Sequence, residues 1–210
     1  MNAPASPAPE PGRCQRLKAA SRREHDSVDT LVLGVRPFES RERYALFLQV
    51  QHRFHGSLQA LYGDAQLNRT LPGLAALSRF EAVQADLRDL GLPVPGVPAP
   101  VQLSAPAEAL GWLYCSEGSN LGAAFLFRQT QQLGLGAQRG ARHLAPHPDG
   151  RALQWRQFVG LIDALVLSEE QERQAVDGAL AAFEFYRSSV RDIFGLGLWR
   201  RLRRLLQESR

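Results

Sequence analysis

His25 is the residue whose side chain offers the most chemistry, because an imidazole can ligate a metal or transfer a proton. Asp29 follows one helical turn later and can accept a hydrogen bond from the other ring nitrogen, which orients the ring for a metal. Lys18 lies two turns earlier on the same helical face, roughly 10 Å along the axis. A flat dianionic ligand whose metal binds His25 would place a carboxylate near Lys18. The alternative is an ordinary core histidine on the apolar stripe of Leu17 and Val28.

Tyr114, Gly118 and Gly122 form a second set at intervals of four residues, and so share one helical face. Each glycine inside a helix costs on the order of 1 kcal/mol relative to alanine, so two on one face need a reason. One reason is the close approach of another helix. The other is the close approach of a planar ligand to bare backbone, with the helix free to bend. Tyr114 would add a phenol on the same side, able to bond a carboxylate or a water.

Gln51 and His55 form a third set, one turn apart on another predicted helix. They fit a solvated polar face, and they also fit a pair that holds ordered waters beside a buried site. Their spacing does not separate these two interpretations.

The elements that must position these residues are helices, because nearly every long segment has apolar residues at the helical period. We expect helices near 13–33, 41–61, 79–90, 105–133, 153–165 and 169–194, with Ser40 and Ser168 as N-caps. The run 105–133 is expected to be interrupted at 117–122, and a proline-rich connector precedes it. Alternating strand patterns are essentially absent. The prediction is an all-α fold of about six or seven helices in a single domain spanning 13–194.

The composition narrows the function classes. The chain has 210 residues and a formal charge of +4, and the segment 200–210, with five Arg and one Glu, accounts for that excess. No basic stripe with interleaved aromatics covers the rest, which disfavours nucleic-acid binding. Residues 1–12 are predicted to be a disordered leader without a signal peptide, and 195–210 a basic amphipathic tail. No apolar stretch is long enough to cross a bilayer, so a cytoplasmic location is expected. The two cysteines, Cys14 and Cys115, are expected to be reduced, partly buried thiols.

The chain resembles the haem oxygenase family, most closely its bacterial branch. The segment 110–126, LGWLYCSEGSNLGAAFL, is similar to that branch's distal-helix signature, and GARHLA at 140–145 is similar to its downstream block. Further matches are Gly150-Arg151, Trp155, Phe158, Glu24-His25 and Arg36-Pro37-Phe38. The likeness covers about residues 13–194.

The resemblance implies a function and a set of roles. Haem would be both cofactor and substrate, cleaved with O2 to biliverdin, carbon monoxide and ferrous iron. Electrons would come from an external redox donor, a reductase or a ferredoxin, and a haem donor or a bacteriophytochrome are further partners that fit. His25 would be the proximal iron ligand, with Asp29 as its partner, and the glycines would let the distal helix lie close over haem. Candidates to order the proton-delivering waters are Gln51, His55 and Arg79, and candidates to contact haem are Lys18, Tyr114 and Ser119.

The resemblance also bears on which haem carbon is cut. Family members that cleave away from the α position hold the rotated propionates with lysines, where this chain has Leu33 and Gln129. Lys18 and Tyr114 look like the propionate anchors of α-cleaving members, so the α isomer of biliverdin is expected. The purpose of cleavage, iron acquisition or supply of a bilin chromophore, stays open.

Two other functions fit parts of the pattern. A haem-binding carrier or sensor would share every pocket feature with the enzyme. A helical adaptor acting through the basic tail would leave Lys18, His25, Tyr114 and the two glycines unexplained together.

Overall fold

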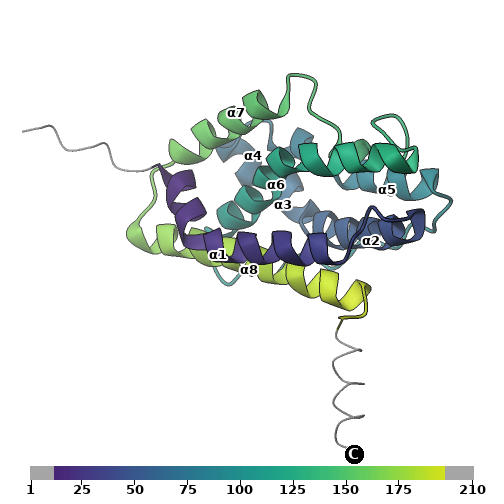
Figure 1. Ribbon diagram of the computed structural model, residues 1–210. Helices are drawn as coiled ribbons and strands as arrows, with labels where there is room; N and C mark the ends of the chain where they lie inside the picture. Colours follow the sequence, from purple (N-terminus) through teal and green to yellow (C-terminus); the bar gives the residue numbers. More distant parts are fainter. Residues whose placement is uncertain (1–11, 197–210) are drawn as a thin grey trace, which may run out of the picture.

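The computed structural model describes residues 12–196, and their regular structure is helical (Figure 1). The longer helices are α1 (Arg13–Gly34), α2 (Arg41–Ser57), α5 (Phe80–Asp89), α6 (Glu108–Thr130), α7 (Arg151–Asp163) and α8 (Glu169–Ile193). Between them lie α3 (Gln59–Gly63), α4 (Ala65–Thr70) and the 3-10 turns η1 (Leu74–Leu77), η2 (Gln131–Leu133) and η3 (Arg142–Leu144). In this range, extended pairing is limited to isolated bridges of Gly136 with Arg139 and Gly140. The all-α prediction is confirmed.

Two predicted N-caps have the expected geometry. The Ser40 side chain accepts a hydrogen bond from the backbone N–H of Arg43 at the start of α2. Ser168 forms a reciprocal capping box with Gln171 at the start of α8, so two backbone donors are satisfied at once. These contacts explain why both helices begin where the sequence predicted.

Two predicted helix limits are wrong. The second helix was expected to continue to Leu61, but α2 ends at Ser57, whose carbonyl accepts a hydrogen bond from the connector residue Val101. The run expected from Ala105 begins only at Glu108, whose carboxylate instead accepts the backbone N–H of Ser104.

The expected interruption of that run at 117–122 is also wrong, because α6 is continuous from Glu108 to Thr130. Glycine lowers helix propensity but keeps its backbone N–H and carbonyl, so the intrahelical hydrogen bonds persist through Gly118 and Gly122. Buried residues on both sides of the two glycines, among them Cys115 and Ala123, hold the helix in place.

The helix α6 packs across α8 at a point where both backbones are bare. A Cβ on Gly111 would collide with the carbonyl oxygen of Ala175, and one on Gly178 would collide with that of Glu108. Glycine at both positions therefore permits backbone-to-backbone contact. The small residues Ala175 and Ala179 of α8 are fully buried at this crossing.

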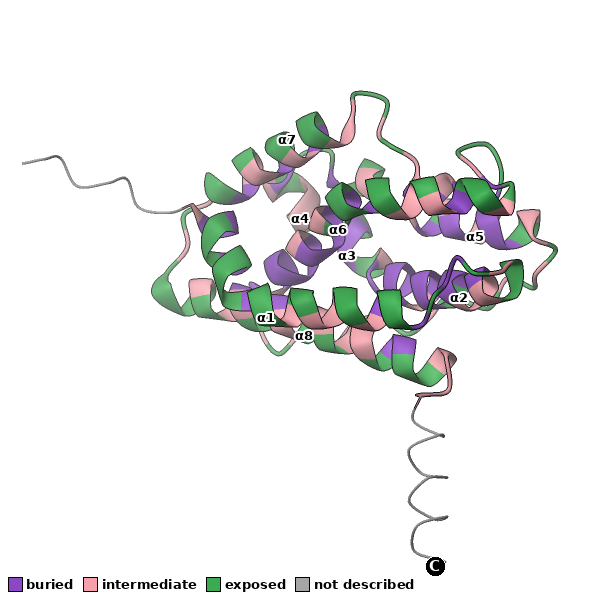
Figure 2. Ribbon diagram, in the orientation of Figure 1, coloured by how far each residue is buried: buried purple, intermediate pink, exposed green. Residues whose placement is uncertain are grey.

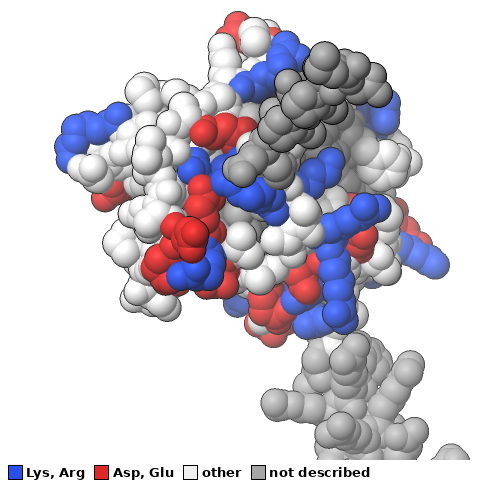
Figure 3. All heavy atoms as spheres, turned by 90° about the vertical axis from the view of Figure 1, so that its left-hand side faces the viewer, with Lys and Arg blue, Asp and Glu red and all other residues white. Residues whose placement is uncertain are grey.

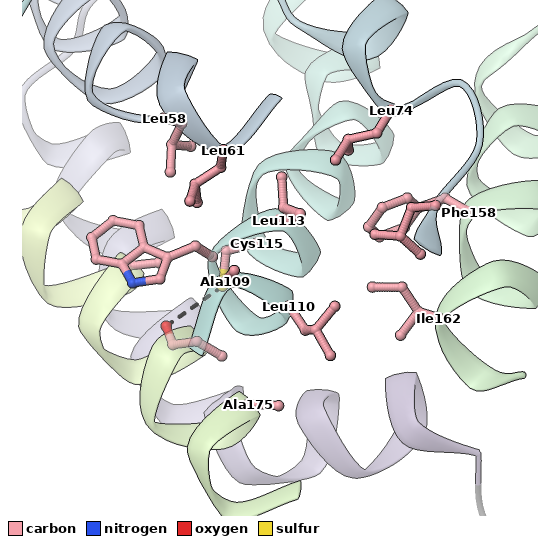
Figure 4. Close-up of a cluster of buried hydrophobic side chains, with 14 of the residues drawn as sticks. Leu58, Leu61, Leu74, Ala109, Leu110, Leu113, Cys115, Phe158, Ile162 and Ala175 are labelled. Carbon is pink, nitrogen blue, oxygen red and sulfur yellow. Dashed lines mark hydrogen bonds between the residues drawn. The ribbon is translucent and has the colours of Figure 1, made fainter. Parts of the chain in front are cut away.

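The core around this crossing combines residues from six helices and turns (Figure 4). Leu58 and Leu61 approach from one side, and Phe158 and Ile162 of α7 approach α6 from another (Figure 4). The thiol of Cys115 lies 3.5 Å from the carbonyl oxygen of Ala179. Cys14 and Cys115 are both free and buried. A second apolar cluster joins the end of α1 to α2, α6 and α8 and includes Val32, Phe38, Tyr44, Phe47, Leu48 and Val190.

Helix α1 runs alongside α8 and has one face open to solvent along much of its length (Figures 1 and 2). Its first turn is fixed by Arg13, which is buried, donates to the carbonyl oxygen of Leu165 at 2.8 Å and pairs with Glu172 of α8. Farther along, Glu24 pairs with Arg187 of α8. The two ion pairs fix α1 against α8 at both ends of its first half.

The face around the start of α8 carries charges of both signs, interspersed with uncharged side chains (Figure 3). Its pairs include Arg16 with Glu172 and Arg173 with Glu170. Within the described residues, no helix has the length and hydropathy of a membrane span. The predicted leader, apart from Gly12, and the tail beyond Leu196 lie outside the described residues.

Candidate functional site

The His25 side chain is 58% exposed, so the interpretation as a core histidine is wrong. Of its neighbours on the apolar stripe, Leu17 is buried and Val28 is half-buried. The ring contacts the edge of Phe183 of α8, with centroids 5.9 Å apart. Its Nδ1 atom lies 3.3 Å from Oδ2 of Asp29. Nδ1 thus has a carboxylate partner, and the opposite nitrogen, Nε2, is left for a ligand.

No other backbone closely approaches Gly118 or Gly122 in the described part of the chain. A Cβ on Gly118 would meet the ring of Trp155 of α7 at 3.5 Å, an ordinary contact distance, and one on Gly122 would meet no described atom within 4 Å. This contrasts with Gly111, where the α8 backbone fills the space. Close approach of another helix therefore does not account for Gly122, whereas Gly118 lies beside a side chain of α7.

The same stretch of α6 exposes apolar side chains. Leu121 and Phe125 are 41% and 46% exposed, and Leu33 near the end of α1 is 56% exposed. A surface pocket of about 200 Å³ lies beside them, lined by Leu33, Arg36, Pro37, Phe38, Glu39, Phe125, Gln129 and Gln132. Exposed apolar groups on two neighbouring elements are typical of a binding surface.

Tyr114 connects the two predicted constellations. Burial raises the pKa of Tyr114, and the nearby Ser21 side chain of α1 opposes that shift. Ser21 lies three residues after Lys18 and four residues before His25. Tyr114 therefore meets α1 between Lys18 and His25, and Lys18 itself is exposed.

Two of the predicted site residues are engaged elsewhere. The Nε2 atom of Gln51 donates to the hydroxyl of Tyr186 of α8 at 2.7 Å. The hydroxyl of Ser119 donates to the carbonyl oxygen of Ser116 in its own helix at 2.7 Å. Gln51 is buried rather than part of a solvated face, whereas Ser119 is exposed.

His55 and Arg79 belong to one buried polar region with His143. Burial lowers the pKa of His55 to about 3, and the nearby charges of His143 and Arg79 lower it further, so this ring is neutral at pH 7. Arg79 donates to the carbonyl oxygens of His143 and Ala145 at 2.6 and 3.2 Å. His55 Nδ1 and Arg79 Nε are buried without a partner among the described residues, and such atoms commonly bind ordered water.

Glu117 is a buried residue of α6, and it was not singled out from the sequence as a site residue. Tyr62 of α3 donates to its Oε1 atom at 2.5 Å, and Asn120 and Gln154 donate to its Oε2 atom, each at 3.1 Å. Burial raises the pKa of Glu117 to about 7, while the hydrogen bond from Tyr62 and the charge of Arg79 oppose the shift. The available sequence signal for Glu117 was a single acidic residue in the middle of a largely apolar helix.

The arrangement suits a ligand that brings its own metal. Among residues 12–196, no three or more His, Cys, Asp or Glu side chains are grouped to hold a metal ion. His25 offers a single exposed imidazole, as an iron already held by a porphyrin requires. The exposed apolar face of α6 offers area for a flat ring, and the buried polar region offers groups that can order water.

Comparison with known proteins gives consistent results. A sequence model described as heme oxygenase matches residues 13–192. The chain is 46% identical over 173 residues to heme oxygenase PigA of Pseudomonas aeruginosa, covering 81% of this chain and 87% of that protein. It is 29% identical over 150 residues to a heme oxygenase of Xanthomonas campestris, covering 71% of this chain and 89% of that protein.

Solved structures agree. Crystal structures of the NO- and CO-bound heme oxygenase from Neisseria meningitidis superpose with a TM-score of 0.85 at 47% identity, covering 89% of this chain and 94% of that one. Heme oxygenase 2 from Chlamydomonas reinhardtii, solved without heme, has a TM-score of 0.73 at 19% identity, covering 86% and 97%. The second likeness concerns the fold alone.

Proposed function

The chain belongs to the haem oxygenase family of haem-degrading oxidoreductases, and from this premise we propose that it binds haem between α1 and α6. His25 would ligate the iron through Nε2, and Gly118 and Gly122 would lie over the opposite face of the ring. The observation that carries this placement is that α1 and α6 each leave part of a neighbouring surface open to a ligand. An exposed, oriented imidazole stands on α1, and α6 carries two glycines that no other described backbone closely approaches, beside exposed Leu121 and Phe125.

The residues present fit such a ligand. The apolar side chains of Leu33, Leu121 and Phe125 would be removed from water by a porphyrin ring, at roughly 25 cal/mol per Å² buried. Lys18, exposed on α1, and Tyr114, near Ser21, would stand at a propionate edge. Bound haem supplies the iron that activates dioxygen, and electrons come from a separate redox donor.

Protons would reach the reaction through water held by the buried polar region. His55 is neutral and one of its nitrogens has no described partner, so it can accept from or donate to a water. Arg79 has an unpartnered Nε, which can only donate. Gln51 uses Nε2 to hold Tyr186 of α8, and its Oε1 atom is the group that would accept from a water.

The side chains at the two ends of the proposed haem site between α1 and α6 support cleavage at the α carbon. Leu33, Phe125 and the uncharged Gln129 line the pocket near the ends of α1 and α6. Arg36, the cation in this lining, pairs with Glu39 of the same pocket at 3.7 Å, so this end suits vinyl and methyl groups. Lys18 stands at the other end, where a charge-assisted hydrogen bond contributes roughly 1.5–3 kcal/mol. A difference of about 1.4 kcal/mol is already tenfold in the ratio of two haem orientations.

The decisive experiment adds haem to the full chain, then ascorbate or a reductase in air, and follows absorption. Loss of the Soret band with growth of biliverdin absorption is expected, and chromatography should show mainly the α isomer. An unchanged Soret band would indicate a haem carrier or sensor, and mainly β and δ isomers would refute the assigned orientation. In His25→Ala the Soret position should change while the apoprotein stays folded, because that side chain is exposed.

A further inference from the structure

A second surface pocket shares no lining residue with the pocket beside Leu33. It has a volume of about 200 Å³ and lies between the turn that precedes α5 and the loop that precedes α7. Its lining consists of Ala76, Leu77, Ser78, Arg79, Ala82, Arg142, Ala145, Pro146, His147 and Gln154. Two of these, Arg79 and Gln154, belong to the buried polar region already described.

Gln154 links this pocket to Glu117. The residue is only 6% exposed, and its Oε1 atom has no partner among the described residues. Its Nε2 atom donates to Oε2 of Glu117 at 3.1 Å. One buried amide thus touches the pocket on one side and the carboxylate on the other.

The Glu117 carboxyl group is surrounded by groups that hold it without neutralising it. Tyr62 and Asn120 donate to it, and Tyr62 also lies 2.7 Å from the hydroxyl of Ser116. Arg79 is the nearby cation, but its hydrogen bonds within the described residues go to backbone carbonyls rather than to Glu117.

The other titratable groups of the region interact with Arg79. His55 and His143 both interact electrostatically with it, and His143 is paired with the buried carboxylate of Asp86 at 2.7 Å. Arg151 donates to the carbonyl oxygen of Asn120 at 2.8 Å. Glu117 is therefore the carboxyl group of this region that lacks a direct ion pair.

The position of Glu117 in the chain connects it to the proposed haem face. It directly precedes Gly118, the glycine whose open side meets only the Trp155 ring. Neighbouring residues of a helix point about 100° apart, so the Glu117 side chain and the open side of Gly118 belong to the same turn of α6. Reduction of dioxygen consumes protons, so a buried site needs a route by which they are replaced.

Resting on the haem position proposed above, we propose that Glu117 stores a proton beneath the distal helix and that the pocket at Gln154 and Arg79 is its water inlet. The carboxylic acid gives its proton to an ordered water on the haem side and takes one from water in the pocket. No electron moves in this step, and the carboxyl returns to its starting form. Gln154 holds the carboxylate at the inner end of the pocket and orients the incoming water through Oε1.

The energetics of the carboxyl group agree with storage. Burial raises the pKa of Glu117 to about 7, so both its acid and its anion are populated near neutral pH. Such a group can release and recover a proton without a large barrier in either direction. A carboxyl paired directly with arginine would stay ionised and could not do so.

The first test needs no haem. Infrared titration of the full-length apoprotein should show a protonated carboxyl band that disappears near pH 7 and is missing in Glu117→Gln. Rapid mixing with D2O should shift this band slowly in Ala82→Trp, which fills the pocket, and at the wild-type rate in Ala85→Trp. Ala82 and Ala85 are both half-buried alanines of α5, but only Ala82 lines the pocket. Equal exchange in the two tryptophan variants, or no such band, would overturn the proposal.

The second test uses the haem complex. Glu117→Gln and Ala82→Trp should bind haem with the wild-type Soret position, while the rate of haem loss falls by about tenfold or more, as for removal of a positioned acid. The wild-type rate should fall as pH rises through about 7, and this step should be absent in Glu117→Gln. A preserved step, or loss of haem binding in Glu117→Gln, would contradict proton storage. A wrong haem site would instead show as a normal Soret band in His25→Ala.

Discussion

His25 and Asp29 are joined across one turn of α1, with the Nδ1 atom of the ring 3.3 Å from the Oδ2 atom of the carboxylate. Both side chains are more than half exposed, at 58% and 62%, so the contact contributes little to the fold by itself. Its effect is on the ring, because a carboxylate at Nδ1 fixes the proton there and turns Nε2 outward as the acceptor.

Replacing Asp29 with Asn should therefore weaken haem binding by about 10- to 100-fold, the usual effect of losing a carboxylate behind a metal-ligating histidine. Haem titration followed at the Soret band measures the change. Asp26→Asn is the matched control, since its carboxylate is 3.9 Å from the same nitrogen and should matter little. Equal effects of the two variants would count against a special role for Asp29.

Gly122→Ala should separate folding from binding. The new methyl group meets no described atom, so the apoprotein should gain up to about 1 kcal/mol in helix propensity. The same methyl group would stand where haem is proposed to lie, and haem affinity or turnover should fall. Urea unfolding of the apoprotein and haem titration measure the two effects, and a variant that binds and turns over haem normally would refute the placement.

Gly111→Ala should have the opposite profile. Its methyl group would collide with the α8 backbone at the carbonyl of Ala175, which a side-chain rotation cannot relieve. We expect a loss of about 1–3 kcal/mol in the free energy of unfolding, as for other overpacked sites. Gly178→Ala, on the facing helix, should cost a similar amount, and an unchanged stability in both would show that the crossing can open freely.

The stability of the apoprotein should carry a pH dependence from Glu117. Its pKa of about 7 in the folded chain exceeds the ordinary value of 4.5, so the folded state binds the proton more tightly than the unfolded state. Stability should fall as pH rises from about 4.5 to about 7 and then level off, and Glu117→Gln should remove this loss, worth up to roughly 3 kcal/mol. Urea unfolding at pH 5 and pH 8 measures it, with Glu81→Gln as an exposed control. An identical pH dependence in Glu117→Gln would contradict the raised pKa.

Introducing two lysines should redirect cleavage. Leu33→Lys with Gln129→Lys places cations in the pocket near the ends of α1 and α6, where propionates would be drawn. A preference of about 1.4 kcal/mol suffices for a tenfold change in orientation, so β and δ biliverdin should replace much of the α isomer. Leu33→Gln controls for polarity without charge. A product that stays α in the double variant would show that charge at positions 33 and 129 does not set the orientation.

The helices and their caps were predictable because they depend on local rules. The Ser40 cap and the Ser168 capping box involve residues three apart in sequence, and their geometry follows from that spacing. The end of α2 was not predictable, because the backbone N–H that donates to the carbonyl oxygen of Ser57 belongs to Val101, far along the chain. Continuity of α6 through its glycines depends on packing around them, which periodicity does not reveal.

The candidate site divides in the same way. His25, Lys18 and Asp29 share one helix, so their relation could be inferred from numbering alone. The buried set could not, because Tyr62, Glu117 and Gln154 come from three helices that only the tertiary fold brings together. Gln51 shows a second limit of prediction from sequence. Its position suited a residue that orders water, but its hydrogen bond to Tyr186 of α8 depends on the tertiary fold.

The contact at Gly111 and Gly178 also has a mechanical consequence. It fixes the first turns of α6 against α8, before Gly118 and Gly122. From Gly122 to Thr130 the helix is about 12 Å long, so a bend of about 10° at that glycine would displace its far end by about 2 Å. Ala123 and Thr130 are buried on the inner side of this part of the helix, while Phe125 is exposed. A backbone rotation at Gly122 would therefore change the width of the site beside Phe125 as far as the packing of Ala123 and Thr130 yields, while the first turns of α6 stay in place.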